Sequence, residues 1–107
     1  MDTKKLRHVV LFGFRDGTTD FEIEEIARRF GSLAQTVPGI ESFEWGANNS
    51  PEGKAGEHTH CFVLTFDSEA ARDAYLPHPE HTQFVAFASP WIERALVIDY
   101  WTNDVGL

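Results

Sequence analysis

Residues 5–15, KLRHVVLFGFR, decide the fold of this chain. The segment is rich in β-branched and aromatic residues, which is typical of a β-strand. Successive side chains of a strand point to opposite faces. Both faces are apolar here, with His8, Val10, Phe12 and Phe14 on one and Val9, Leu11 and Gly13 on the other. Such a strand is expected to be buried on both faces.

The residues that follow predict a helix that packs against this strand. Asp16 and Gly17 form a turn, and Thr19 with Glu22 three residues later has the spacing of a capping box. Apolar residues then recur at steps of three and four as far as Val37, which places one stripe toward a core. The dipeptide at 38–39, Pro-Gly, ends the helix.

Three more strands and two short helices are predicted downstream. The strands are residues 40–46 (IESFEWG), 58–66 (HTHCFVLTF) and 94–101 (RALVIDYW), and residues 47–57 form a loop. Ser68 caps a short helix through Tyr75, after which Pro77 and Pro79 interrupt it. Pro79 suits the first position of another helix. That helix presents His81, Phe84, Val85 and Ala88 on one face and ends at Pro90.

The order β-α-β-β-α-β predicts an α+β, ferredoxin-like fold with a four-stranded antiparallel sheet and helices on one face. The chain has 107 residues, which makes residues 1–107 a single domain. The first, third and fourth strands are apolar on both faces, so something must cover the face without helices. We expect a second copy to do so, which gives a homodimer of the dimeric α/β-barrel kind.

Charge and cysteine content restrict the class of partner. The formal net charge is −8, which repels nucleic-acid phosphates and anionic lipid, so neither is an expected partner. No apolar stretch is long enough to cross a membrane. The single cysteine, Cys61, cannot form a disulfide within one chain, which favours a reducing, cytoplasmic location.

Histidine, tyrosine and aspartate side chains form the candidate site. If the large residues of the strands pack under the helices, His8 and His60 point into the same layer. Asp99 lies between Ile98 and Tyr100 in the last strand, and a buried carboxylate needs a partner, for which a histidine is the obvious candidate. His81, in the first turn of its helix, could act as a general base supported by Asp99. Tyr75 could donate a hydrogen bond to a carbonyl that becomes an enolate.

Simpler interpretations of the same residues remain open. A histidine on an apolar strand is usually a core residue with its hydrogen bonds satisfied, and Tyr75 could simply anchor a helix end. His58 and His60 project the same way and could bind a metal, but no third ligand is spaced with them, so no metal site is predicted from side chains. The many phenylalanines are more often core than cofactor site.

Four segments together resemble the Dabb family, the stress-responsive dimeric α/β-barrel domains. They are HVVLFGFR, VPGIESFEWG, HTHCFVLTFDS and AYLPHPEH, and the last is the most specific. The resemblance covers nearly the whole chain and implies the dimeric fold above. It also implies roles known from a plant polyketide cyclase of the family, with the base at His81 and its carboxylate support at Asp99. The pocket tyrosine falls on Tyr75, and two pocket histidines fall on His8 and His60.

Two further expectations come from the resemblance. A second pocket tyrosine of the cyclase falls on Phe30 here, which removes a hydroxyl from a pocket that Phe84 is also expected to line. No cofactor is expected, although relatives imply a structural magnesium ion near the helix end before the PGI turn, held largely by backbone carbonyls.

Three functions are therefore compatible with the sequence. The first is a Dabb-type small-molecule enzyme, polyketide-cyclase-like or lyase-like, in which His81 is a general base acting on a small apolar or polyketide-like molecule. The alternative is a non-catalytic, stress-responsive dimer that only binds such a ligand. The third is a structural dimer in which the polar residues satisfy one another and the pocket is closed.

Overall fold

The computed structural model describes residues 4–103 and contains the predicted order of elements. The elements are β1 (Leu6–Phe14), α1 (Asp20–Thr36), β2 (Ile40–Ala47), β3 (His60–Phe66), α2 (Glu69–Tyr75), α3 (Pro79–Ala88), the 3₁₀ turn η1 (Ser89–Trp91) and β4 (Ile92–Trp101). β3 starts two residues later than predicted, because the His58 backbone N–H closes a turn onto the Ala55 carbonyl. β4 starts two residues earlier than predicted.

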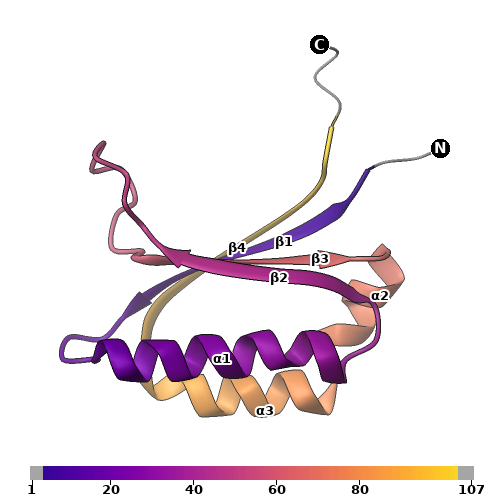
Figure 1. Ribbon diagram of the computed structural model, residues 1–107, viewed down its shortest axis with the longest axis horizontal. Coiled ribbons are helices and arrows are strands. Elements are labelled where there is room, and N and C mark those ends of the chain that lie inside the picture. Colours follow the sequence, from indigo (N-terminus) through magenta and orange to yellow (C-terminus); the bar gives the residue numbers. More distant parts are fainter. Residues whose placement is uncertain (1–3, 104–107) are drawn as a thin grey trace.

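The four strands form one antiparallel sheet in the order β2-β3-β1-β4, and the helices lie on one face of it (Figure 1). This confirms the ferredoxin-like α+β fold. The Thr19 capping box begins α1 as expected. The core lies between α1 and the sheet, where Ile26, Phe30 and Leu33 pack with Phe62 and Leu64. No helix among residues 4–103 is both long enough and apolar enough to cross a membrane.

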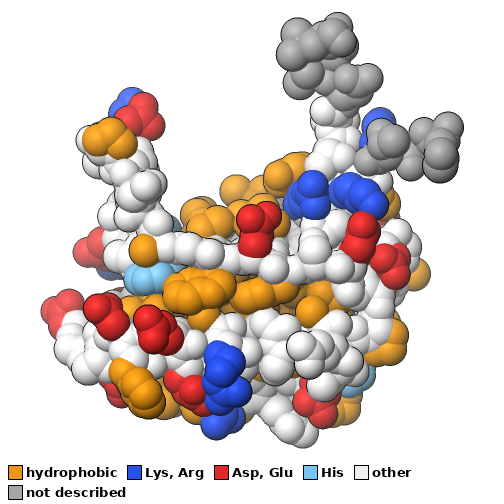
Figure 2. All heavy atoms as spheres, viewed as in Figure 1, with side chains coloured by type: hydrophobic (Ala, Val, Ile, Leu, Met, Phe, Trp, Pro, Cys, Tyr) orange, Lys and Arg blue, Asp and Glu red, His pale blue; other side chains and the backbone are white. Residues whose placement is uncertain are grey.

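The opposite face of the sheet carries no helix and is apolar. The strand register places Val9 and Leu11 of β1, Val63 of β3, and Leu96, Ile98 and Tyr100 of β4 on this side. We call this set the open apolar face. Ile98 is 55% exposed, and Figure 2 shows apolar side chains along the upper side of the sheet, beside the raised β2–β3 loop. A patch of this kind is characteristic of an interaction surface.

The β2–β3 loop is fastened to the sheet where it returns to β3. The backbone N–H of Thr59 donates to the Phe12 carbonyl, and the Glu57 carbonyl passes directly over Gly13. A Cβ at Gly13 would lie 2.2 Å from the Glu57 oxygen. Gly13 is therefore required by this close approach of two backbones, a role that its place in an apolar strand does not reveal.

Replacement of Gly13 should test this contact. Gly13→Ala forces the loop backbone away, and we expect it to lower the free energy of unfolding by about 1–3 kcal/mol, the usual cost of overpacking. Gly46→Ala is the matched control, because nothing lies within 4 Å of a Cβ at that position of β2. Urea unfolding at one protein concentration measures both. Equal stabilities of the two variants would show that the loop does not cross Gly13.

Candidate functional site

A cavity of about 360 Å³ lies between α3 and the β1–β4 side of the sheet. Its size is within the range of small-molecule sites. The strands contribute His8, Val10, Phe12, Ala95 and Val97, and the helices contribute Phe30, Tyr75, His81, Phe84, Val85 and Ala88. Five of the predicted site residues therefore share one cavity: His8, Phe30, Tyr75, His81 and Phe84.

The connection between α2 and α3 brings Tyr75 and His81 together. Tyr75 is the last residue of α2, and His78 begins α3 by capping the Glu80 backbone N–H, with Pro79 in the first turn. This tight connection leaves the Tyr75 and His81 rings 4.2 Å apart between centroids. The ring of His8, from β1, lies 5.9 Å from that of Tyr75. Two imidazoles and one phenol thus meet at one end of the cavity.

His81 is held in one tautomer by the backbone. Its Nδ1 lies 2.9 Å from the carbonyl oxygen of Leu76, so Nδ1–H donates and Nε2 keeps a lone pair. Burial lowers the pKa of His81, the Leu76 hydrogen bond opposes this, and the neighbouring His8 lowers it slightly further. Burial is the largest of these effects. A neutral imidazole with a free Nε2 can accept a proton near pH 7.

Tyr75 carries an unsatisfied polar atom. The residue is fully buried, and its hydroxyl is the one buried side-chain N or O atom without a hydrogen-bond partner among residues 4–103. Burial also raises the pKa of the phenol, so the hydroxyl keeps its proton. Leaving a buried donor unpaired costs about 1–3 kcal/mol, which a protein normally avoids. A donor that lines a cavity without a protein partner is suited to bind an acceptor atom of a ligand.

Asp99 contacts His8 and not His81, which corrects the expected pairing. Its Oδ1 lies 2.7 Å from His8 Nδ1, and its Oδ2 accepts from Arg72 at 3.3 Å. The reason is the register, in which His8 and Asp99 are directly opposite on β1 and β4. Nδ1 of His81 is already engaged by Leu76. Arg72 was not among the predicted site residues, although its position three residues before Tyr75 puts both side chains on one side of α2.

His60 does not line this cavity, which is a second correction. It points to the helix side as predicted, but β3 lies between β1 and β2, away from the cavity. Its ring stacks on Trp45 with centroids 6.2 Å apart, and its Nδ1 is 2.8 Å from the Thr59 hydroxyl oxygen. Burial lowers the pKa of His60. His60 instead lines a separate hollow of about 440 Å³ together with Trp45 and His58.

Comparison with known proteins identifies the family. The family model described as the stress responsive A/B barrel domain, Dabb, matches residues 6–102. The chain belongs to the Dabb family. It is 33% identical to the stress-response A/B barrel domain-containing protein HS1 of Arabidopsis thaliana over 95% of this chain and 94% of that protein. It is 26% identical to olivetolic acid cyclase of Cannabis sativa over 89% of this chain and 94% of that protein.

Solved structures of similar proteins agree with the fold. A hydroxynitrile lyase from Passiflora edulis superposes with a TM-score of 0.86 at 25% identity, covering 94% of this Dabb chain and 95% of that chain. A dimeric ferredoxin-like protein of unknown function from Jannaschia superposes with a TM-score of 0.78 at 28% identity, covering 90% and 97%. The Dabb family thus includes cyclase and lyase relatives as well as members of unknown function, and the catalytic roles of His81, Tyr75 and Asp99 stay predictions.

A metal centre built from side chains is not formed in the described part of this Dabb domain. Among residues 4–103 no three His, Cys, Asp or Glu side chains gather into a metal-binding group. At the end of α1, the backbone N–H of Val37 donates to the Leu33 carbonyl. The magnesium ion expected there from the resemblance would depend on backbone carbonyls, and it stays a prediction.

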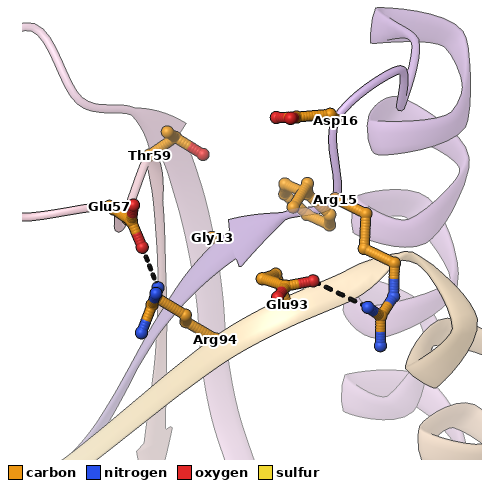
Figure 3. A pocket seen from close by; sticks show the side chains of 8 residues that line it. Gly13, Arg15, Asp16, Glu57, Thr59, Glu93 and Arg94 are labelled. Carbon is orange, nitrogen blue, oxygen red and sulfur yellow. Dashed lines mark hydrogen bonds and ion pairs between the residues drawn. The ribbon is translucent and has the colours of Figure 1, made fainter.

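A second hollow, of about 590 Å³, lies where the β2–β3 loop crosses the end of β1 (Figure 3). Four of its five charged side chains neutralise one another, because Arg15 pairs with Glu93 and Arg94 pairs with Glu57, and Asp16 is the fifth. All four paired side chains are well exposed, so these pairs contribute little stability, and the hollow keeps only the exposed carboxylate of Asp16 for a ligand. The polar hollow is a weaker candidate than the cavity of Tyr75 and His81.

The unpaired hydroxyl of Tyr75 leads to a prediction about stability. Tyr75→Phe removes a buried donor that has no protein partner, so we expect the ligand-free protein to gain about 1 kcal/mol in the free energy of unfolding. Denaturant unfolding of the two proteins measures the difference. A clear loss of stability in Tyr75→Phe would mean that the hydroxyl is hydrogen-bonded within the protein and is not reserved for a ligand.

Proposed function

We propose that this Dabb domain is a small-molecule enzyme in which His81 acts as a general base on a carbonyl compound. One observation carries the proposal: Tyr75, with its buried and unpaired hydroxyl, and His81, with its free Nε2, line the same cavity. A base and a hydrogen-bond donor at one point are the two groups that enolate chemistry requires.

The proposed reaction uses each group at a stated atom. Nε2 of His81 takes a proton from the carbon next to a carbonyl, and the electron pair of the broken C–H bond moves onto the carbonyl oxygen. The hydroxyl of Tyr75 donates a hydrogen bond to that oxygen and stabilises the enolate. The enolate carbon then forms a bond to a second carbonyl carbon, and His81 returns its proton to the new alkoxide. The walls around these groups are mainly apolar.

The relatives support this class of reaction. One relative is a cyclase and another is a hydroxynitrile lyase. Cleavage of a hydroxynitrile into a carbonyl compound and cyanide needs a base for the hydroxyl proton, as enolate formation needs one for a C–H proton, so a histidine in the place of His81 could serve either reaction. We therefore extend the cyclase-like or lyase-like character of these relatives to this chain as part of the proposal.

The other two functions make different demands on the cavity. A purely structural dimer needs a closed site, and the open cavity lined by His81 and Tyr75 counts against it. A non-catalytic binding protein would use the same apolar walls and the Tyr75 hydroxyl without any proton transfer. Substitution of His81 separates these two functions. An enzyme that uses His81 as its base loses turnover, whereas a binding protein keeps its ligand affinity and has no turnover in wild type.

Turnover should depend on neutral His81. Since burial lowers the pKa of His81 below the ordinary imidazole value near 6.5, the base stays neutral at lower pH than a free histidine. We expect kcat/KM to persist to lower pH than a base with an ordinary imidazole pKa would allow, and to fall as the pH drops through the lowered pKa. His81→Gln should reduce kcat by about 10²–10⁴-fold.

The assay screens hydroxynitriles and linear β-polyketones, with products followed by liquid chromatography. His58→Gln is the matched control, because His58 is another half-buried histidine that lies outside this cavity. Unchanged kcat in His81→Gln for every substrate that wild type converts would refute the mechanism.

We also propose that the protein is a homodimer that buries the open apolar face. Similar solved structures are described as dimeric, and this face presents aliphatic and aromatic side chains of β1, β3 and β4 together. Two sheets packed face to face would remove these side chains from water, which favours association by about 25 cal/mol per Å² of apolar area.

A charge placed in the open apolar face should separate the two copies. Ile98→Glu would bury a carboxylate at the interface, so we expect a monomer by size-exclusion chromatography with light scattering, where wild type is a dimer. Phe21→Glu is the control, because Phe21 is 78% exposed but lies on α1, away from this face. A monomeric wild type, or a dimer that survives Ile98→Glu, would contradict the proposal.

A further inference from the structure

We infer that the cavity selects uncharged carbonyl ligands and rejects carboxylates of the same shape. The inference rests on the proposed function only in assigning the cavity to a ligand, and it narrows the chemical class of that ligand. It follows from where the charges around the cavity lie.

The hydrogen-bonding groups of His8, Tyr75 and His81 are gathered at one end of the cavity. In the pairing of β1 with β4, His8 lies opposite Asp99 at this end, and Phe12 lies opposite Ala95 four residues further along. Four residues of strand correspond to about 13 Å. The stretch between is lined mainly by apolar side chains. A ligand with one oxygen-bearing end and an apolar body fits this division.

No lysine or arginine lines the cavity among residues 4–103. The nearest cation in the network is Arg72, which donates to Asp99 and also to Asp73, so its charge is taken up by two carboxylates. Asp99 in turn lies directly behind His8. A ligand anion at the His8–Tyr75–His81 end would approach the Asp99 carboxylate without a counterion. Burying an unpaired charge in this way is costly.

A neutral carbonyl oxygen at the same end of the cavity avoids this cost. It requires a donor and no counterion, and the unpaired hydroxyl of Tyr75 supplies the donor. The groups that face this end from every packed element are His8 and Asp99 from the sheet, Arg72 and Tyr75 from α2, and His81 from α3. Because burial lowers the pKa of His81, this histidine is uncharged at pH 8 and offers no positive charge to an anion.

Two probes of nearly identical shape test the inference at pH 8. They are 4-phenylbutan-2-one and 3-phenylpropanoate. The first ends in a methyl ketone, and the second ends in a carboxylate. Titrations followed by two-dimensional NMR of the dimeric protein give both dissociation constants. We expect the ketone to bind at least about tenfold more tightly, as suits one uncompensated buried charge. Shifts at Phe84 and Val85 would place it in the cavity.

A lysine placed at the cavity should reverse the preference. Val85 lines the cavity and is 47% exposed, so Val85→Lys can be accommodated, and we expect the carboxylate to gain affinity severalfold. Ala86→Lys is the matched control, because it adds the same charge to the same helix at an exposed position outside the cavity. Asp99→Asn removes the carboxylate that contacts His8, so it should also reduce the difference between the dissociation constants of the two probes.

The outcomes separate this inference from the proposed function. Three results would overturn the selectivity. They are equal affinities for the two probes, no binding of either probe, and an equal gain in carboxylate affinity in Ala86→Lys and Val85→Lys. If the selectivity fails while His81→Gln still abolishes turnover, the proposed function stands without it. If the ketone is preferred but His81→Gln leaves turnover unchanged, the selectivity stands and the general-base mechanism fails.

Discussion

The antiparallel pairing of β1 with β4 joins the two ends of the chain, and the rest of the structure depends on it. The register sets His8 opposite Asp99, which gives the carboxylate a partner inside the sheet. The same register lines up Val10 with Val97 and Phe12 with Ala95 as one wall of the cavity. On the reverse side it aligns Val9 with Ile98 and so builds the open apolar face. A shift by one residue would exchange the two faces.

The second determinant is the short connection between α2 and α3. Pro77 and Pro79 limit the backbone there, and His78 caps the start of α3 with its own side chain. As a result the Leu76 carbonyl remains free to accept from His81, and the tautomer of the proposed base is fixed by the backbone. Tyr75 is buried at the end of α2 by packing against Phe66. The reactive end of the cavity is therefore built by chain geometry.

The sequence allowed the fold to be predicted because its signals are local. Capping residues, prolines and strand alternation placed every α-helix and β-strand within about two residues, and the apolar reverse face of β1 indicated an uncovered sheet. Partners between elements were harder to predict. Asp99 was correctly expected to bind a histidine, but choosing between His8 and His81 needs the strand register, which sequence spacing does not give. The pocket role of His60 was wrong for the same reason, because facing the helices does not say where across the sheet a strand lies.

The partner of Asp99 changes the character of the proposed base. With Asp99 on His8, the imidazolium formed at His81 would be supported only by the Leu76 carbonyl in a partly buried site. Burial makes that charged form costly, as the lowered pKa of His81 reflects. Such a base holds a proton briefly and returns it readily. This suits a reaction in which one proton leaves and comes back within a single turnover, as in ring closure through an enolate. It suits less well a reaction in which His81 must remain charged.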